Sequence, residues 1–209
     1  MRIALFGGSF DPVQRGHVVI GRVAAEEMAL DTVLFAPVGN QPLKPEGASA
    51  SFDDRLAMVA LACVGDARFE VAELDGPRAD GRPNYTVDTL VHLQEQRPGA
   101  QLFLLTGADS LLDLRLWHEP DRVLEIAEWI AVSRPGFDLA DLDSLGLTPD
   151  QRGRVHLIES VQEEVSSTEL RRRMAAGESC GELLPEGVAA YIVEHGLYRQ
   201  ARPILTQFP

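Results

Sequence analysis

The sequence predicts an α/β protein built on a doubly wound parallel sheet, and three observations support this prediction. Short apolar or β-branched runs alternate with segments of helical periodicity over most of the chain, which is typical of parallel strands joined by helices. A glycine-rich loop follows the first of these runs, where α/β proteins hold phosphates. After residue 159 only helical patterns remain.

Strands are expected wherever a short run is rich in Val, Ile, Leu, Phe or Trp: residues 2–6, 32–37, 68–72, 101–105, 129–133 and 154–158. Helices are expected where apolar residues recur every three to four positions: 17–29, 52–64, 86–96 and 120–127. Ser166 to Glu169 has the form of a capping box that begins a later helix, and Pro185 to Glu194 forms another. The segments 38–51 and 73–84 are read either as substrate loops or as plain surface connections.

Length and composition predict one domain over the 209 residues, with a helical subregion from about residue 160 to 200. No run of about 18 apolar residues exists, and glycines interrupt the N-terminal apolar run too early for a signal peptide. We therefore expect a soluble, cytoplasmic protein with no membrane partner. Cys63 and Cys180 are too few for a disulfide framework and are expected to be reduced structural thiols.

The formal net charge of −13 argues against a nucleic-acid partner, because nucleic acids attract clustered Lys and Arg. A small polyanionic substrate would need a local positive patch, for which Arg15, Lys44, Arg134 and the run Arg171 to Arg173 are candidates. A solvated helix face is the alternative interpretation of that run. The sequence leaves open whether the chain forms a homo-oligomer.

Residues 7–17 have the composition of a phosphate-binding loop. Gly7 and Gly8 let backbone amides approach an anion, and Gly16-His17 opens a helix whose N-terminal dipole favours negative charge. The dipole disfavours a charged His17, and a bound phosphate would reverse that preference and let the ring donate hydrogen bonds. A structural turn and a structural histidine are the alternative interpretations.

Two common nucleotide-binding motifs are absent. No segment matches G-x-x-x-x-G-K-[ST], and no G-x-G-x-x-G follows the first strand, which excludes a P-loop NTPase and a conventional dinucleotide-binding dehydrogenase. Arg171 lies one turn inside the helix that begins near Ser166. A cation there is mildly unfavourable unless an anion is also present, and a nucleotide phosphate would supply one.

The segment Gly-Gly-Ser-Phe-Asp-Pro-Val-Gln-Arg-Gly-His at 7–17 resembles the signature of the adenylyltransferases, which usually ends His-x-Gly-His. Other segments extend the resemblance, in the family's order, to the bacterial nicotinate mononucleotide adenylyltransferases: Ala36 to Asn40, Asp54 to Met58, Tyr85 to Leu90, Gly107 to Asp109, Trp117, Ser133 to Gly136, Ser166 to Thr168, Leu184-Pro185 and Gly196 to Tyr198. The resemblance implies a Rossmann-like nucleotidyltransferase fold. It also implies transfer of the adenylyl group of ATP to nicotinate mononucleotide, giving deamido-NAD and pyrophosphate.

The resemblance further implies roles for individual residues. At the ATP site it implies backbone contacts, phosphate contacts and a ribose site from Gly8, Ser9, Phe10, His17, Gly107, Asp109, Arg134, Ser167, Thr168 and Arg171. At the acceptor site it implies Asn40, Lys44, Thr86 and Trp117, with backbone amides near the last two receiving the ring carboxylate. Simple structural alternatives are a helix cap for Asp109 and Ser166 and a core position for Trp117.

Two departures from the family pattern lie in the phosphate region. Gln14 stands at the first histidine of the signature, and Gln41-Pro42-Leu43-Lys44 stands where the family usually has Pro-Pro-His-Lys. Each change removes a potential cation, although the Gln14 amide can still donate hydrogen bonds.

The expected chemistry is in-line attack of a phosphate oxygen on the α-phosphorus of ATP, which requires no protein nucleophile. His17, Arg171 and Gln14 would act through positioning and charge, with Mg²⁺ held mainly by the substrate phosphates. Two alternatives stay open. One is the same fold with another acceptor, such as nicotinamide mononucleotide or phosphopantetheine. The other is a nucleotide-binding protein whose catalysis is impaired by Gln14.

Overall fold

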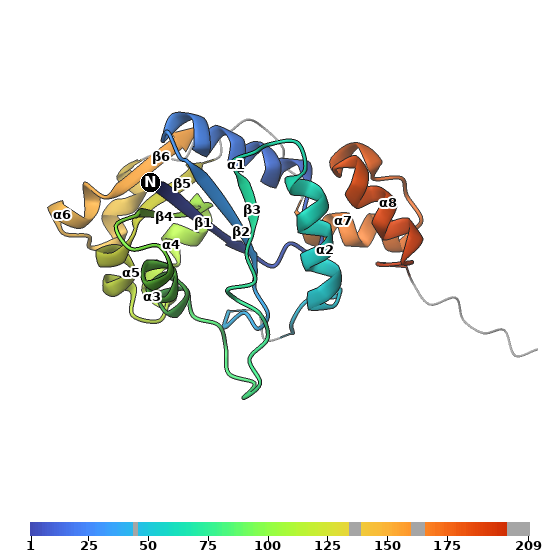
Figure 1. The fold of residues 1–209 in the computed structure, drawn as a ribbon, viewed down its shortest axis with the longest axis horizontal. Helices are drawn as coiled ribbons and strands as arrows, with labels where there is room; N and C mark the ends of the chain where they lie inside the picture. Colours follow the sequence, from blue (N-terminus) through green and yellow to red (C-terminus); the bar gives the residue numbers. More distant parts are fainter. Residues whose placement is uncertain (44–45, 134–138, 160–165, 200–209) are drawn as a thin grey trace, which may run out of the picture.

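The structure is a computed structural model that describes residues 1–43, 46–133, 139–159 and 166–199. Its centre is one parallel sheet with the strand order β3-β2-β1-β4-β5-β6 (Figure 1). The strands are β1 (Arg2–Gly8), β2 (Thr32–Pro37), β3 (Phe69–Val71), β4 (Gln101–Gly107), β5 (Glu128–Ser133) and β6 (Val155–Glu159). This order is that of a doubly wound sheet, so the predicted fold class is confirmed.

The six predicted strands agree with the observed ones to within two residues at each end. They were recognisable because both faces of the sheet are covered, which makes each strand a continuous apolar run. In β1, Ala4 and Phe6 pack into the hydrophobic cluster on one face, while Ile3 and Leu5 pack into the cluster on the other. The side chains of a strand alternate between its two faces, so one short strand contributes to both halves of the core.

The two faces carry different helices (Figure 1). One hydrophobic cluster joins the sheet to α1 (Arg15–Glu27), α2 (Phe52–Cys63), α7 (Ser167–Ala175) and α8 (Glu186–Glu194). The other joins it to α3 (Thr86–Gln96), α4 (Ala108–Leu112) and α5 (Pro120–Ile126). Shorter elements are α6 (Pro149–Arg152) and the 3-10 helices η1 (Leu114–Leu116), η2 (Leu139–Leu145) and η3 (Gly181–Leu183).

The predicted helices are confirmed, with one shift at the start of α1. The sequence placed this start at residue 17, but Gln14 is the N-cap and the helix begins at Arg15. The elements α4 and α6 and the 3-10 helices were not predicted, because each is too short to show a periodic pattern. No helix in the described ranges is long and apolar enough to cross a membrane.

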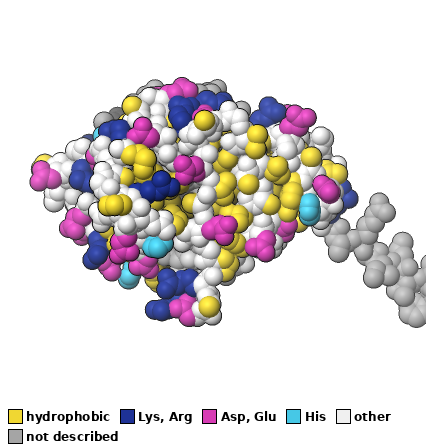
Figure 2. Space-filling view, viewed as in Figure 1, with side chains coloured by type: hydrophobic (Ala, Val, Ile, Leu, Met, Phe, Trp, Pro, Cys, Tyr) yellow, Lys and Arg dark blue, Asp and Glu magenta, His cyan; other side chains and the backbone are white. Residues whose placement is uncertain are grey.

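The C-terminal helix α8 lies beside α2 (Figure 1). Ser166 caps α7, since its hydroxyl accepts a hydrogen bond from the Glu169 amide at 3.1 Å. The predicted capping box is only half formed, because the Glu169 carboxylate binds Arg172 and Arg173 instead of the backbone. On the face in Figure 2, hydrophobic side chains gather over α2 among scattered acidic groups.

The position of the site follows from the topology. The chain leaves β1 toward β2 on one side, and β4 leads to β5 on the other, so strand order reverses between β1 and β4. The glycine loop follows β1 and Gly107 ends β4, which places both at the carboxyl edge of that reversal. Ligands of doubly wound sheets bind in the crevice at this point.

Candidate active site

A cavity of about 1130 Å³ lies at this edge of the sheet. It is lined by the glycine loop, the first residues of α3, the end of β4, the segment after η1 and the first turn of α7. Ligand pockets for one drug-sized molecule measure about 300–1,000 Å³, so this cavity lies above the usual range for a single small ligand. Its walls come from segments that are far apart in the sequence.

The glycine loop is held by the ring of Phe10. This residue has a positive φ of 45°, which is a strained conformation for a bulky side chain. Its buried ring packs edge-on against Phe6 and His17, with centroid distances of 5.5 and 5.1 Å. A Cβ at Gly8 would lie 3.1 Å from the Phe10 ring, so the absence of a side chain at Gly8 lets the ring pack closely against the loop backbone. Packing thus maintains the strained loop at the cavity wall.

His17 is oriented by the backbone of its own helix cap. Its Nδ1 accepts a hydrogen bond from the Gln14 amide at 3.0 Å, which assigns the proton of the neutral ring to Nε2. Burial lowers the pKa of His17 to about 4, so the ring is neutral at physiological pH. The sequence suggested that a phosphate would charge this ring. The structure offers a simpler donor, the neutral Nε2–H, because His17 already lines the cavity.

Gln14 lies behind the cavity wall and is not among the lining residues. Its side-chain amide donates a hydrogen bond to Ser167 Oγ at 2.8 Å, and the residue is 8% exposed. Ser167 and Thr168 line the cavity at the start of α7. Gln14 therefore reaches the site through Ser167, by joining the beginning of α1 to the beginning of α7.

Arg171 is the one member of the arginine run that lines the cavity. Its Nη1 donates to the backbone oxygen of Asp11 at 2.7 Å and lies 3.5 Å from Asp11 Oδ2. Arg172 and Arg173 instead pair with Glu169, at 2.7 and 2.8 Å. The interpretation as a solvated helix face is therefore correct for these two residues and wrong for Arg171.

Asp11 joins several segments, and the sequence analysis did not assign it a role. Its buried carboxylate accepts hydrogen bonds from the amides of Ser49 and Ala50 and, at 2.7 Å, from the Tyr198 hydroxyl. Burial and the Asp11 charge raise the pKa of Tyr198, which keeps this hydroxyl protonated as a donor. Buried Arg55 lies close by and donates to the Ser9 carbonyl at 2.7 Å.

The opposite end of the cavity is formed by residues around α3 and the segment after η1: Asn84, Tyr85, Thr86, Leu116, Trp117 and His118. Thr86 begins α3. The Asp88 amide in its first turn donates to the Tyr85 carbonyl at 3.0 Å, so the Thr86 and Val87 amides are the ones left without an acceptor in the helix. The Trp117 amide donates to the Leu114 carbonyl at 3.0 Å, so it is not free for a ligand. The Trp117 indole Nε1 is buried and has no hydrogen-bond partner among the described residues. Trp117 thus offers its side chain rather than its own amide.

The other predicted site residues fall into two groups. Gly8, Ser9, Phe10 and Gly107 line the cavity as expected. Asn40 does not line it; its side chain donates to the Gly81 carbonyl at 3.1 Å and supports the neighbouring loop. Lys44 and Arg134 lie outside the described residues, and Asp109 is described only as a backbone position in α4.

A protein cage for a metal ion is absent from the described ranges, where no group of three or more His, Cys, Asp or Glu could hold one. The Mg²⁺ ion expected from the sequence would keep its waters and bind through substrate phosphates. Such an ion stays a prediction.

Gly39 provides a test of how loop 73–84 supports the acceptor end. A Cβ at Gly39 would lie 2.5 Å from the backbone nitrogen of Pro77, so Gly39→Ala must displace that loop. We expect a loss of about 1–3 kcal/mol in the free energy of unfolding. For the reaction that the sequence predicts, we expect KM for the acceptor to rise more than KM for ATP. Steady-state kinetics and urea denaturation measure both. Gly181→Ala is the control, since a Cβ there meets nothing within 4 Å. Equal effects of the two variants would contradict the prediction.

Comparison with known proteins adds independent findings. The family model described as cytidylyltransferase-like matches residues 5–173. The chain is 39% identical to a Rubrobacter xylanophilus protein named "Probable nicotinate-nucleotide adenylyltransferase", over 95% of this chain and 92% of the relative. A protein of the same name from Neisseria meningitidis is 40% identical, over 95% and 99%. The fold is similar to that of a Plasmodium falciparum nicotinic acid mononucleotide adenylyltransferase complexed with NaAD. The TM-score is 0.76 at 16% identity, over 94% of this chain and 97% of that chain.

Proposed function

Because the chain belongs to the cytidylyltransferase-like family, and within it to the nicotinate-nucleotide adenylyltransferases, we propose that it transfers the adenylyl group of ATP to nicotinate mononucleotide. The products are deamido-NAD and pyrophosphate, and the reaction belongs to NAD biosynthesis. The observation that carries the proposal is the single cavity that has the glycine loop, His17 and Arg171 at one end and Thr86 and Trp117 at the other. Two nucleotides bound there would meet at their phosphates.

The reaction needs positioning and charge rather than a protein nucleophile. A phosphate oxygen of the mononucleotide attacks the α-phosphorus of ATP, and the bond from the α-phosphorus to the bridging oxygen breaks and releases pyrophosphate. We propose that the loop Gly8 to Phe10 presents backbone amides to ATP, while the His17 Nε2–H donates a neutral hydrogen bond. Arg171 contributes positive charge from the first turn of α7.

We further propose that Mg²⁺ binds through the phosphates, where it neutralises part of their negative charge. The residues of this chain then align the two substrates and exclude water. Burial lowers the pKa of His17 to about 4, so in the protein without substrates the ring is neutral near pH 7.

The acid form of the acceptor is expected to be preferred over the amide. First-turn amides of α3 reward a carboxylate with charge-assisted hydrogen bonds, whereas a carboxamide presents a donor of its own to them. We expect kcat/KM for nicotinate mononucleotide to exceed that for nicotinamide mononucleotide by about 10- to 100-fold.

A coupled pyrophosphate assay with nicotinate mononucleotide, nicotinamide mononucleotide and phosphopantetheine measures this preference. Equal efficiency with the two pyridine nucleotides would contradict it. No turnover with any acceptor, together with ATP binding in calorimetry, would overturn the transferase function and favour a nucleotide-binding protein.

A further inference from the structure

Asp75 is a buried carboxyl group in the wall of the cavity for which the reaction described above has no use. It is 6% exposed, lies in loop 73–84 and lines the acceptor end of the cavity. Its Oδ1 accepts a hydrogen bond from Thr89 Oγ1. No Lys, Arg or His among the described residues pairs with it. A buried carboxylate without a counter-charge is unfavourable, and such groups are normally paired.

The position of this carboxyl group is fixed on two sides. The Asp75 carbonyl accepts a hydrogen bond from the Gly39 amide at 2.7 Å, which connects the loop to the segment after β2. The Asn84 side chain donates to the Gly76 carbonyl at 3.0 Å, which closes the loop onto itself. Thr89 lies one turn along α3, and its hydroxyl is also 3.3 Å from the Tyr85 carbonyl. The carboxyl group is therefore held beside the first turn of α3.

We infer that Asp75 is a specificity-determining residue that recognises the positively charged pyridinium ring of the acceptor nucleotide. This inference rests on the proposed function. A pyridine ring bonded to ribose through its nitrogen carries a positive charge, and its carboxylate is attached two ring atoms away from that nitrogen. The helix N-terminus of α3 suits the carboxylate, and Asp75 suits the ring cation. The substrate thus supplies the counter-charge that the described part of the protein does not provide.

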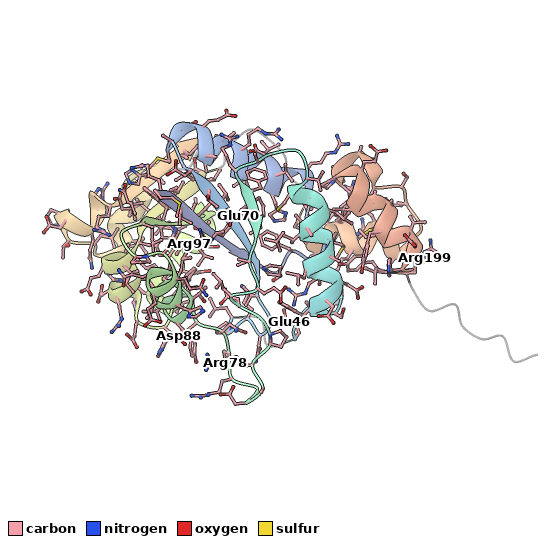
Figure 3. All side chains as sticks on the ribbon, viewed as in Figure 1. Glu46, Glu70, Arg78, Asp88, Arg97 and Arg199 are labelled. Carbon is pink, nitrogen blue, oxygen red and sulfur yellow. The ribbon has the colours of Figure 1, made fainter. Side chains whose placement is uncertain are left out.

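The ionisation of Asp75 agrees with this role. Burial raises its pKa to about 6; the Thr89 hydrogen bond opposes this shift and the Asp88 charge adds to it. The carboxyl group is therefore mostly charged above pH 7 and mostly protonated below pH 5. Tyr85 and His118 are the other titratable groups at this end of the cavity, and Asp11, His17, Glu46 and Arg171 also line it. Asp88 on α3 forms an ion pair with Arg78 in loop 73–84, at a distance of 3.8 Å (Figure 3).

The test compares two ligands and two variants. The ligands are nicotinate mononucleotide and its C-riboside isostere, 3-carboxyphenyl riboside 5′-phosphate, in which carbon replaces the ring nitrogen and removes the charge. Asp75→Asn should weaken binding of nicotinate mononucleotide about tenfold in calorimetry and leave binding of the isostere unchanged. Asp80→Asn is the matched control, since Asp80 lies in the same loop 73–84, is exposed and does not line this cavity. It should affect neither ligand.

A second measurement needs no variant. In the natural protein, the ratio of the two dissociation constants should favour nicotinate mononucleotide above pH 7 and fall toward one as the pH is lowered to 5 and Asp75 takes up its proton. Titration of the shared phosphate cancels in the ratio. The comparison stops at pH 5, because the carboxyl group of the isostere lacks the neighbouring ring cation and takes up its proton at a higher pH than that of nicotinate.

Three results would overturn the inference. Equal weakening of both ligands by Asp75→Asn would show a purely structural role. Tighter binding of nicotinate mononucleotide would show that Asp75 repels the carboxylate. A pH-independent ratio would exclude charge recognition. Failure of the natural protein to bind nicotinate mononucleotide would overturn the proposed function as well, whereas normal turnover with any of these three results would overturn the inference alone.

Discussion

Arg171→Ala is expected to reduce kcat/KM for ATP by about 30- to 1,000-fold, which corresponds to roughly 2–4 kcal/mol of transition-state stabilisation. Arg171 lines the cavity at the start of α7, and its only described carboxylate neighbour, Asp11 at 3.5 Å, is shared with Tyr198 and two backbone amides. Its guanidinium can therefore turn part of its hydrogen-bonding capacity toward a phosphate. The loss of folding stability should be smaller than that of Asp11→Ala, because the Asp11 carboxylate keeps its hydrogen bonds from Tyr198 and two backbone amides and alanine is a strong helix former.

The control for this prediction is Arg172→Ala. Arg172 is exposed and pairs with Glu169 at 2.7 Å, so its removal should leave kcat/KM for ATP unchanged. Steady-state kinetics with a coupled pyrophosphate assay measure both variants, and thermal denaturation checks their folding. If the two alanine variants had the same activity as the natural protein, Arg171 would also belong to the solvated face.

The fold could be predicted because its signal is local. A strand covered on both faces has few polar positions, mostly at its ends, so β1, β2, β4 and β5 were visible as short apolar runs. The longer helices were visible because one side of each is apolar. The elements that the sequence did not reveal, such as α4 and η1, span at most about two helical turns. A segment this short shows no periodic pattern of apolar residues.

The candidate site could be predicted only where a motif marks it. The glycine loop, His17, Thr86, Trp117 and Arg171 came from patterns or from resemblance, and the structure brings them to one cavity. Contacts that depend on folding carried no such signal. Nothing in the sequence indicates that the hydroxyl of Tyr198 would meet a carboxylate 187 positions away, or that Asp75 would be buried beside Thr89.

Such contacts also explain why the immediate surroundings of individual residues could not be predicted. Gln14 was expected at the polyphosphate because of its place in the motif, yet its amide is directed to Ser167 on α7. Asn40 was expected at the acceptor, yet it supports loop 73–84 through Gly81 and Asn84. In both cases the sequence identified the correct region, and the packing of a second segment determined which atoms face the cavity.

Asp11→Ala is expected to lower the free energy of unfolding by about 3–5 kcal/mol, as for other buried charges left without a partner. The Asp11 carboxylate is 3.5 Å from Arg171 and accepts hydrogen bonds from the Ser49 and Ala50 amides and the Tyr198 hydroxyl. Burial lowers the pKa of Arg55, and the Asp11 charge opposes that effect, so removing Asp11 leaves a buried cation uncompensated.

Urea denaturation of three variants, Asp11→Ala, Tyr198→Phe and Asp31→Ala, separates the effect of the Asp11 charge from that of its hydrogen bonds. Tyr198→Phe removes one hydrogen bond to Asp11 and should cost only about 1 kcal/mol, while the carboxylate still balances Arg55 and Arg171. Asp31→Ala is the control for removing an exposed carboxylate. Asp31 accepts one hydrogen bond from the Arg2 amide at 2.6 Å, and its 4.0 Å contact with the N-terminus contributes little. If Asp11→Ala were no more costly than Asp31→Ala, the Asp11 carboxylate would not be what holds α2, α7 and the glycine loop together. A loss several times that of Tyr198→Phe would show that the charge, more than any single hydrogen bond, fixes Arg171 at the cavity.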